Sequence, residues 1–527
     1  MSNNRAVYGI DLGTTYSCIA QIDKYDQPTI LRNFEGDNTT PSAVYFDSAE
    51  HVVVGKEAKD LLATEPDKTV ILIKRQIGID EAFDKANNTL PYHYDPAEIS
   101  GFILKKLVKD ANDLGDNPEP IKDVVITCPA YFGTKERVQT KQAGAAAGLN
   151  VLAIINEPTA AAISYGLKTD QKKSVLVYDL GGGTFDVTII NVNGGAIKVI
   201  ATGGDHHLGG IDWDTLLAEY MLAAFNEANG TSYTLEDNAE LKYTLLLEAE
   251  LKKKLLTAKE NVRANIQYDG MSARIEITRD TFESLTQNLL NDTLDMTQKV
   301  IDIAKQKGYN NIDEFLLVGG SSKMPQVKRA LDARFGCDAK LNEPDECVAK
   351  GAAIYAMNAA YADAIEKYEN GEIDEKPQPL RTDRTVVVNV TSKTYGTSLV
   401  NEQVGNIIFA NTSLPINLTK TFYTVYDNQT GVELDVYESD FTNPEEHETV
   451  DRKFCTCVHK HTMPLKGQYP KGTEVQLTYK IDNEGILSIS ALVAQKEKTD
   501  FELHISGIKN AEELQRSIEL VAKAIVE

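Results

Sequence analysis

The pattern of apolar and polar positions changes once along the chain, near residue 370. Before that point, short apolar runs alternate with longer segments in which apolar residues recur every three or four positions. The runs predict strands at 124–127, 174–178 and 315–318. The longer segments predict helices at 99–112, 211–229, 241–258 and 281–307. Strands that alternate with helices are typical of an α/β architecture, in which sites lie at strand ends.

Beyond that point the texture becomes that of a small all-β domain. A helical pattern at 352–367 gives way to the acidic segment 369–384, which carries two prolines and is typical of a linker. Short alternating runs then predict strands at 385–390, 421–426, 432–437, 474–481 and 486–492. Turn signals lie at 427–431 and 482–485. The last stretch, 510–527, is amphipathic and predicts a helix.

Two segments of the α/β part look like variants of one device. Each leads from an apolar strand to an aspartate, Asp11 or Asp179, and then through small residues into a second strand. Glycine lets the backbone approach a ligand, so successive N–H groups can surround phosphate oxygens, and the aspartate can hold a hydrated cation. Neither a Walker A pattern nor a Gly-x-Gly-x-x-Gly fingerprint accompanies them. The pair predicts a duplicated nucleotide clamp.

Length and charge narrow the classes of function. A chain of 527 residues is too long for one ordinary core, and its net charge of −24 disfavours a nucleic-acid or anionic-membrane surface. An acidic chain that binds a nucleotide needs local cations or a metal. No apolar run approaches the ~20 residues needed to cross a bilayer, and the N-terminus lacks a signal peptide's hydrophobic stretch, so we expect a cytoplasmic protein. The six cysteines are scattered, without a disulfide framework or metal-site spacing.

Six motifs, the two hairpins among them, carry a specific resemblance. In chain order they are Gly9-Ile-Asp-Leu-Gly-Thr-Thr, Ile155-Asn-Glu-Pro-Thr-Ala-Ala-Ala, Tyr178-Asp-Leu-Gly-Gly-Gly-Thr-Phe-Asp, Gly204-Asp-His-His-Leu-Gly-Gly, Leu317-Val-Gly-Gly-Ser-Ser and Asn342-Glu-Pro-Asp-Glu-Cys-Val-Ala-Lys-Gly-Ala-Ala. Together they resemble the heat shock protein 70 family, the DnaK-type chaperones. The resemblance implies an α/β actin-like ATPase domain, a duplicated ribonuclease H-like fold, followed by an all-β sandwich that binds substrate peptides.

The resemblance also implies a division of the chain into four parts. We expect the nucleotide-binding ATPase domain at 1–368 and an acidic segment with an apolar interdomain linker at 369–390. The β-sandwich peptide-binding domain is expected at 391–508, and a short C-terminal helix at 509–527. ATP hydrolysis in the first domain would control the binding and release of extended apolar peptides by the sandwich.

The phosphate site implied by the family comprises residues of both hairpins. Its expected binding residues are Gly13, Thr14, Thr15, Tyr16, Gly181, Gly182, Gly183 and Thr184. Asp11, Asp179 and Glu157 match carboxylates that hold Mg²⁺ through water, and Asp186 matches a position that helps to place K⁺ or water. Metal-mediated neutralisation would answer the charge problem of an acidic chain.

Catalysis is expected to depend on Lys74, Thr14, Glu157 and Asp179. Lys74, in Ile73-Lys-Arg-Gln-Ile-Gly78, aligns with the family's lysine beside the γ-phosphate, whereas a lone helical lysine is usually a solvated surface group. Thr14 would position the attacking water, so catalysis would come from positioning and electrostatics rather than from covalent chemistry.

The adenosine side resembles the family less closely. Gly319, Gly320, Ser321 and Asp345 match, although a Gly-Gly after a strand is by itself more often a plain turn. The ribose and base positions carry Glu250, Lys253, Lys254 and Thr257. Lys254 and Lys323 stand where the family usually has Arg, whose planar group stacks on adenine as an ammonium cannot. We therefore expect ATP and ADP to bind, with weaker affinity than is usual.

The family also implies a route between the domains. Val386, Val387 and Val388 occupy the place of the apolar linker, although an ordinary first strand of the β domain explains them equally well. Pro129 and Arg137 match residues that transmit the nucleotide state to that linker. In the sandwich, Phe422, Val432 and Leu434 fall near the expected peptide pocket, and core packing is the alternative for each.

Departures from the family pattern limit what it implies. The helical lid needs far more residues than 510–527 provide, so we expect a chain that is lidless or cut short. Ala153 and Asn389 stand at positions used by J-domain partners, which puts stimulation by such a partner in question. Unfolded polypeptide clients, a J-domain co-chaperone and a nucleotide exchange factor are the expected partners, with no nucleic acid and no membrane.

Three competing interpretations share parts of the pattern. A sugar kinase or a filament-forming actin relative has the phosphate hairpins but is expected to lack a separate β domain. A non-hydrolysing chaperone relative, acting as a scaffold or exchange factor, keeps the architecture and loses catalysis. Thr14, Lys74, Glu157 and Asp179 together argue against the last of these.

Overall fold

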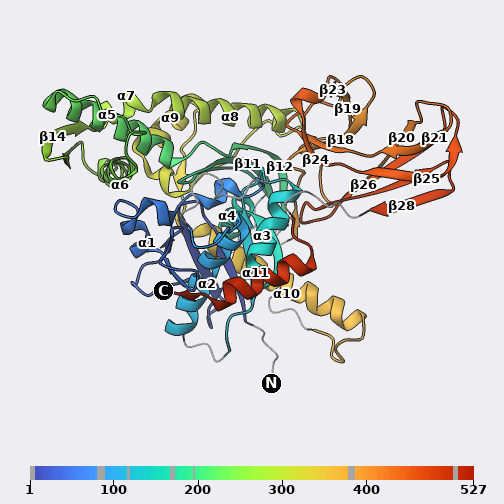
Figure 1. Ribbon diagram of the computed structural model, residues 1–527, viewed down its shortest axis with the longest axis horizontal. Coiled ribbons are helices and arrows are strands. Elements are labelled where there is room, and N and C mark those ends of the chain that lie inside the picture. Colours follow the sequence, from blue (N-terminus) through green and yellow to red (C-terminus); the bar gives the residue numbers. More distant parts are fainter. Residues whose placement is uncertain are drawn as a thin grey trace.

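Two sheets of one design form the α/β part of the protein (Figure 1). The computed structural model describes residues 6–79, 90–115, 119–166, 172–193, 196–377, 386–501 and 508–527. The first sheet has the order β3-β2-β1-β8-β9, with β4 beside β2, and the second has the order β16-β15-β10-β11-β12-β17. Each contains an antiparallel hairpin whose first strand also pairs in parallel with a later strand. This repetition confirms the predicted duplicated α/β architecture.

The first sheet consists of β1 (Val7–Asp11), β2 (Tyr16–Ile22), β3 (Pro28–Leu31), β4 (Thr40–Pro41), β8 (Asp123–Cys128) and β9 (Asn150–Asn156). The second consists of β10 (Lys173–Leu180), β11 (Phe185–Asn193), β12 (Ala196–Asp205), β15 (Glu314–Val318), β16 (Lys340–Leu341) and β17 (Val386–Val388). We call the parts built around them lobe I and lobe II. Lobe I also carries the small strands β5 (Val44–Phe46), β6 (His51–Val54) and β7 (Thr69–Val70).

Helices cover both sheets and lie between them. Those associated with lobe I are α1 (Lys56–Leu61), α2 (Pro96–Leu114) and α3 (Thr134–Ala146). Those of lobe II are α5 (Gly210–Asn229), α6 (Ala239–Leu256), α7 (Arg279–Leu285), α8 (Gln287–Gln306) and α9 (Pro325–Phe335). Helices α4 (Glu157–Gly166) and α10 (Cys347–Glu369) share a buried core with strands of both sheets. The two helices cross closely at Gly351, because this residue has no Cβ; a Cβ there would overlap the carbonyl oxygen of Ala160.

Most predicted elements of the α/β part are present, with one helix divided. The pattern at 281–307 predicts a single helix, but the chain forms α7 and α8 with Thr286 between them. The Thr286 hydroxyl donates to the carbonyl oxygen of Phe282 at 2.9 Å. A threonine bonded to its own preceding turn offers the backbone an alternative to a continuous helix.

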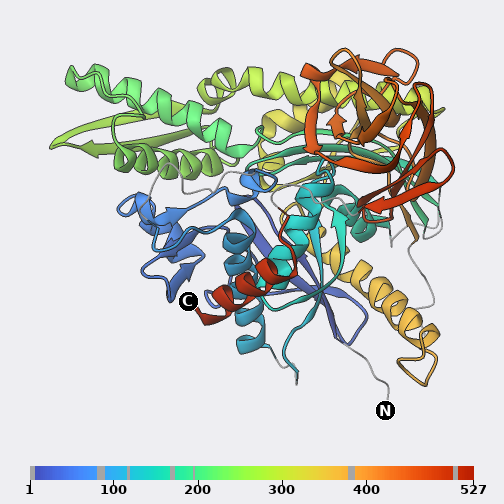
Figure 2. The ribbon, with the colours of Figure 1, turned by 45° about the vertical axis from the view of Figure 1, so that its right-hand side comes forward.

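The second part of the chain is an antiparallel β-sandwich, as expected. One sheet has the order β23-β19-β18-β22-β24, another has the order β20-β26-β27-β28, and β21 pairs with β25. Their bounds are β18 (Thr394–Leu399), β19 (Gln403–Ile408), β20 (Ile416–Tyr423), β21 (Gln429–Glu433), β22 (Val436–Ser439), β23 (Thr449–Asp451), β24 (Thr456–His459), β25 (Thr462–Tyr469), β26 (Glu474–Ile481), β27 (Leu487–Val493) and β28 (Glu497–Phe501). The sandwich lies against lobe II near β11 and β12 (Figures 1 and 2).

Two segments that follow the α/β part in sequence pack against it in space. Strand β17 pairs in parallel with β12, so residues 386–388 of the segment predicted at 385–390 extend the lobe II sheet instead of beginning the sandwich. At the other end of the chain, helix α11 (Ala511–Lys523) lies on lobe I and is followed by β29 (Ile525–Val526), which pairs in parallel with β6. The predicted helix at 510–527 therefore ends at Lys523. The acidic segment 369–384 falls partly outside the described residues.

Candidate nucleotide site

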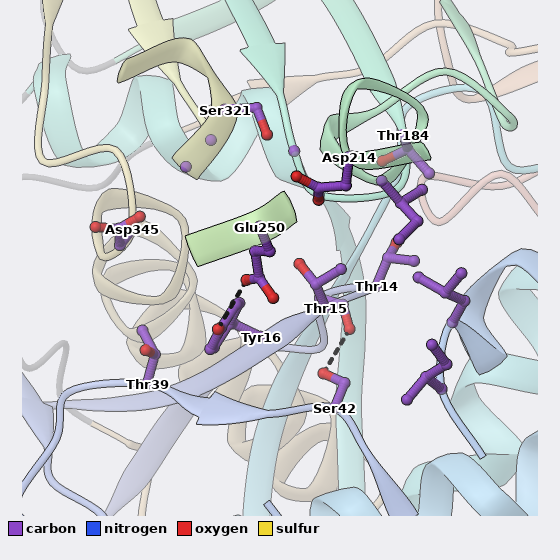
Figure 3. Close-up of a pocket in the computed structure, with 18 of the residues that line it drawn as sticks. Thr14, Thr15, Tyr16, Thr39, Ser42, Thr184, Asp214, Glu250, Ser321 and Asp345 are labelled. Carbon is purple, nitrogen blue, oxygen red and sulfur yellow. Dashed lines mark hydrogen bonds between the residues drawn. The ribbon is translucent and has the colours of Figure 1, made fainter. Parts of the chain in front are cut away.

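The two hairpins meet at a cavity of about 470 Å³ between the lobes. A Cβ at Gly182 would overlap the side chain of Thr15, and one at Gly183 would overlap that of Thr14. Glycine is therefore required at both positions for the hairpins to approach each other. Figure 3 shows Thr14, Thr15 and Thr184 grouped on one side of the cavity, with Tyr16, Glu250 and Asp345 on the other. The small residues in the two turns thus place their backbones around one space.

Acidic side chains gather where the hairpins meet. Asp11 ends β1, Asp179 lies near the end of β10, and Asp186 lies directly across from Asp179 on β11. Burial and the neighbouring Glu157 raise the pKa of Asp11 to about 7. The same two causes hold the pKa of Asp179 and of Asp186 well above the ordinary value. Buried carboxylates that repel one another require positive charge close by.

Lys74 supplies one such charge. It lies in the short 3-10 helix Ile73–Gln76, is 4% exposed, and forms an ion pair with Glu157 at the start of α4. Although burial opposes its charge, Glu157 and Asp11 raise the pKa of Lys74, so it is an ammonium group at neutral pH. The structure therefore brings together the lysine and all three predicted metal carboxylates.

The acidic groups suit a hydrated divalent cation. Their oxygens are the hard donors that Mg²⁺ prefers, and Mg²⁺ usually keeps several of its waters. Within the described ranges, no group of three or more His, Cys, Asp and Glu side chains converges closely enough to hold a metal directly. The carboxylate oxygens suit Mg²⁺, and binding through water stays a prediction. Thr127 donates its hydroxyl to Asp11 at 2.9 Å, and the Ala130 N–H donates to Asp186 at 3.0 Å, which orients these two carboxylates.

Exposed ion pairs line the other end of the cavity. Lys323 pairs with Asp345, and Lys254 pairs with Glu250 at 2.7 Å. Gly319, at φ +80°, turns the chain after β15 so closely that a Cβ there would overlap the Asp179 carboxylate. The Gly-Gly turn therefore joins the two ends of the cavity.

A contact between the lobes closes over this end, and no sequence pattern predicts it. Lys59 of α1 pairs with Glu250 of α6 at 2.5 Å and donates to the Tyr16 hydroxyl at 2.9 Å. Tyr16 in turn donates to Glu250 at 3.1 Å (Figure 3). Although burial opposes the charge, Lys59 and Lys254 lower the pKa of Glu250 to about 2. A lone lysine in a six-residue helix carries no sequence signal, so Lys59 was not predicted.

Most of the predicted nucleotide residues border this one cavity. Those on its wall are Asp11, Gly13, Thr14, Thr15, Tyr16, Lys74, Glu157, Asp179, Gly181, Gly182, Thr184, Glu250, Lys253, Lys254, Thr257, Gly319, Gly320, Ser321, Lys323 and Asp345. Gly183 and Asp186 lie behind the wall, against Thr14 and Ala130 respectively. Asp214 is an unpredicted wall residue that accepts from Lys253 at 2.7 Å.

Two of the predicted interdomain residues, Pro129 and Arg137, lie where lobe I meets the sandwich. Buried Arg137 donates to the carbonyl oxygen of Phe132 at 2.9 Å, to the Asn156 side chain at 2.6 Å, and to the carbonyl oxygen of Glu484 at 3.3 Å. Pro129 begins the turn that leads from β8 to Phe132, whose N–H donates to the Pro129 carbonyl oxygen at 3.2 Å. Arg137 thus joins α3, β9 and the turn before β27.

The three predicted peptide-pocket residues belong to the interior of the sandwich. Val432 and Leu434 are buried in its core, and Phe422 packs against that core with part of its side chain exposed. Larger exposed fractions are found at Tyr423 and Tyr426. The role of all three predicted residues in peptide binding stays a prediction.

Comparisons with known proteins cover nearly the whole chain. The model of the family described as "Hsp70 protein" matches residues 7–524. The chaperone protein DnaK of Thermotoga neapolitana is 38% identical over 498 residues, which are 92% of this chain and 78% of that protein. The chaperone protein DnaK of Halobacterium salinarum is 36% identical over 494 residues, which are 92% of this chain and 72% of that protein. In the part of the chain that the structure describes, no helix is long and apolar enough to cross a membrane.

Proposed function

The chain belongs to the Hsp70 family of ATP-dependent molecular chaperones, and on this premise we propose which of its residues perform the ATPase cycle. The protein is an ATPase that binds nucleotide with Mg²⁺ and binds unfolded polypeptides. The observation that carries the assignment is the buried Lys74–Glu157 ion pair beside Asp11 and Asp179, where two glycine hairpins touch.

In this proposal the hairpins bind the phosphates. The backbone N–H groups around Gly13 and Gly181 face phosphate oxygens, as successive N–H groups of glycine turns do. The carboxylates of Asp11, Asp179 and Glu157 hold a hydrated Mg²⁺, which when bound neutralises charge on those oxygens. Asp186, raised in pKa by burial, orders K⁺ or water behind them.

Lys74 and Thr14 then act on the attacking water. Glu157 fixes the Lys74 ammonium group in the cavity wall, from which it stabilises charge that develops in the transition state. The Thr14 hydroxyl, 6% exposed, orients the water for in-line attack on the γ-phosphate. No covalent intermediate is required.

A chain of contacts supports coupling to the sandwich. Asp186 accepts from Ala130, and the same turn ends at Phe132, whose carbonyl oxygen accepts from both Arg137 and Ser392. Ser392 lies at the start of the sandwich, so a shift of the second hairpin reaches it through two hydrogen-bonded steps. Val387 and Val388 of β17 provide a second connection, through β12.

The finer assignments belong to the same proposal. Extended apolar segments of clients bind near Phe422, Val432 and Leu434, and a J-domain protein and an exchange factor regulate the cycle. All six cysteines are unpaired, as suits a protein of the reducing cytoplasm. The domain limits are 1–368, 369–390, 391–508 and 509–527, with the last part serving lobe I, as argued below.

The test measures release of a fluorescent apolar peptide together with ATP hydrolysis. We expect ATP to accelerate release from the wild type at least about fivefold, because coupling energies between sites are typically ~1–3 kcal/mol. Lys74→Ala should release peptide on ATP binding yet fail to recapture it through hydrolysis. Peptide affinity that is indifferent to ATP would contradict the coupling and leave a nucleotide-binding scaffold.

A further inference from the structure

The segment 508–527 follows the sandwich in sequence but belongs to lobe I in space. Helix α11 lies along α2 and α3, and the C-terminus lies near α1 (Figures 1 and 2). Strand β29 extends the β7-β5-β6 sheet of lobe I by pairing with β6. We call residues 508–527 the tail.

Apolar side chains of the tail are part of the lobe I core. Val521, Ala524 and Val526 are 0%, 3% and 2% exposed, and they cluster with side chains of β1, β6 and α2. The helix lies close to α2, since a Cβ at Gly101 would be in ordinary van der Waals contact, 3.6 Å, with Cγ2 of Val521. Burial of this kind contributes ~25 cal/mol for each Å² of apolar surface, so the tail is firmly held.

The carbonyl groups and N–H groups at the end of the tail are also satisfied by lobe I. Lys105 of α2 donates to the carbonyl oxygens of Val521, Ala522 and Ala524 at 2.8, 3.1 and 2.7 Å. A lysine at this place caps the free carbonyls of a helix C-terminus and favours its dipole. The Ile525 N–H donates to the Glu50 carbonyl oxygen at 2.7 Å, and the Glu527 N–H donates to that of Val52 at 3.0 Å.

The beginning of the tail is anchored by charge. The Lys509 ammonium group, 15% exposed, pairs with Asp95 at 2.6 Å and with Glu98 at 2.7 Å. Ser517 donates to Glu98 at 2.7 Å, and Gln142 of α3 donates to the Lys509 carbonyl oxygen at 2.7 Å. The beginning of the tail is therefore fixed to α2 and α3, and its end is fixed to α2 and β6.

The sandwich itself touches the ATPase lobes through several polar contacts. Asn411 accepts from the Thr202 N–H at 2.8 Å, and Lys307 donates to the Asn411 carbonyl oxygen at 2.7 Å. Burial lowers the pKa of Lys307 to about 8, so this contact weakens as the pH rises. Such contacts can separate without exposing a core, whereas the tail cannot leave lobe I without doing so.

The tail also limits how far the sandwich can move. Six residues separate Phe501, the end of β28, from Ile508. Consecutive Cα atoms are ~3.8 Å apart, and an extended chain gains at most ~3.6 Å per residue, so this end of the sandwich stays within about 25 Å of Ile508. The sandwich is thus held by β17 on lobe II at one end and by the tail on lobe I at the other.

We propose that residues 508–527 are a resident clasp that stays on lobe I with either ATP or ADP bound and keeps the sandwich close to the ATPase domain throughout the cycle. The clasp differs from a lid that leaves with nucleotide state, because its side chains complete the lobe I core. It does not depend on the assignment of Lys74 or on hydrolysis.

The test removes one backbone hydrogen bond of β29. Ile525 is 61% exposed, so Ile525→Pro deletes its N–H without emptying the core, and Ile525→Ala, which keeps that N–H, is the matched control. Hydrogen exchange of peptides covering 50–54 and 521–527, and the radius of gyration by X-ray scattering, are measured with ATP and with ADP. Nucleotide affinity reports whether the cleft of each variant is intact.

In the wild type and in Ile525→Ala, we expect tail exchange rates with ATP and ADP to agree within about threefold and the molecule to stay equally compact. Ile525→Pro should exchange at least about tenfold faster at both strands and should enlarge with ADP. Tail exchange in the wild type that is tenfold faster with ADP than with ATP, or an Ile525→Pro variant as compact as the control, would overturn the proposal.

A second pair of variants covers the case in which Ile525→Pro does not fold. Lys105→Met removes the cap of the last turn of α11 while keeping the aliphatic stem, and Lys109→Met changes an exposed lysine of the same helix. Lys105→Met should accelerate exchange in the tail and Lys109→Met should leave it unchanged. Equal exchange in the two variants would count against the clasp, whatever their ATPase activity.

Discussion

The two ends of the nucleotide cavity are built from different kinds of charged side chain. At the phosphate end Lys74 is 4% exposed and paired with a buried glutamate, whereas at the adenosine end two lysines, Lys254 and Lys323, are 55% and 45% exposed, although a third, Lys253, is buried against Asp214. A charge interaction strengthens as water is excluded, and exposed ion pairs contribute little each. The difference suggests that the phosphate end performs the chemistry and that the adenosine end regulates how long nucleotide stays.

The largest effect is expected from Lys74→Ala. The loss of a buried charge aimed at the transition state should lower the single-turnover hydrolysis rate at least about 100-fold, or ~3 kcal/mol. ATP affinity should change by less than about threefold, because the bound ground state of ATP is held mainly by other residues of the cavity. Lys106→Ala is the control, because Lys106 is also buried and paired with an aspartate, Asp110, but does not border the cavity. An equally slow Lys106→Ala would contradict a specific role of Lys74.

Asp179→Asn should mainly change the dependence on Mg²⁺. Removal of one carboxylate that orients a hydrated metal typically costs about 10–100-fold in metal affinity, so hydrolysis should recover when Mg²⁺ is raised. Asp205→Asn, in the same lobe but outside the cavity wall, serves as the control. A defect that no Mg²⁺ concentration relieves would show that Asp179 does something other than hold the metal. Chelation of Mg²⁺ should abolish hydrolysis in every variant.

Glu438 is a buried glutamate that does not border the nucleotide cavity, so it tests the effect of burial on a carboxyl pKa separately from nucleotide binding. In the docked sandwich, burial and the facing Glu136 raise its pKa to about 7; Asp440 adds to this effect, and Lys393 and Lys135 oppose it. Unfolding returns the pKa to the ordinary 4.5, so the folded state binds the proton more tightly. The stability that this proton provides is complete below pH 4.5 and is lost as the pH rises to about 7.

Glu438→Gln should therefore stabilise the protein at pH 8 by about 1–2 kcal/mol relative to the wild type, and by much less at pH 5. Urea unfolding at the two pH values measures this difference. Glu433→Gln, on an exposed strand position of the same domain, is the control. Single-turnover hydrolysis should not change, and a wild type as stable at pH 8 as at pH 5 relative to Glu438→Gln would refute the linkage.

Glu250→Gln should affect nucleotide release. The change weakens the contacts with Lys59, Lys254 and Tyr16 that join the lobes, so ADP should dissociate about fivefold faster. Stopped-flow release of a fluorescent ADP measures the rate. Glu248→Gln, which removes a pair with Lys252 on the same helix, should leave it unchanged. A large loss of hydrolysis in Glu250→Gln would contradict the claim that the adenosine end regulates nucleotide release without taking part in hydrolysis.

The smallest effect is expected from Lys323→Arg. A planar guanidinium can stack on adenine, so ATP should bind about two- to threefold more tightly, as isothermal titration can measure. Lys328→Arg, on the adjoining helix α9, is the control. Weaker binding by Lys323→Arg would show that the pair with Asp345 has a function that arginine cannot replace.

Prediction from sequence succeeded where the backbone itself carries the function. The hairpins at Asp11 and Asp179 need glycine and threonine at fixed places, since Gly182 and Gly183 have no room for a Cβ, and such requirements leave a visible motif. Lys74 was found only because its neighbours resemble a family motif. The cavity wall confirms that these residues come together, while their chemical roles stay predictions.

Side chains whose partners are distant in sequence do not belong to a recognisable motif. Lys59 and Asp214 border the cavity through contacts with residues far away in sequence, and their own segments look like ordinary amphipathic helices. The strand β29 was missed as a part of lobe I because a short apolar run fits any free sheet edge, and its partner is decided by tertiary contacts. The core burial of Val432 and Leu434 is another example.

A double-variant cycle tests most directly whether the two ends of the cavity act separately. Single-turnover hydrolysis and ADP release are measured for the wild type, Lys74→Ala, Glu250→Gln and the double variant. We expect the double variant to hydrolyse ATP as slowly as Lys74→Ala and to release ADP as fast as Glu250→Gln, with coupling below ~0.5 kcal/mol. Coupling above ~1 kcal/mol in either rate would contradict the account.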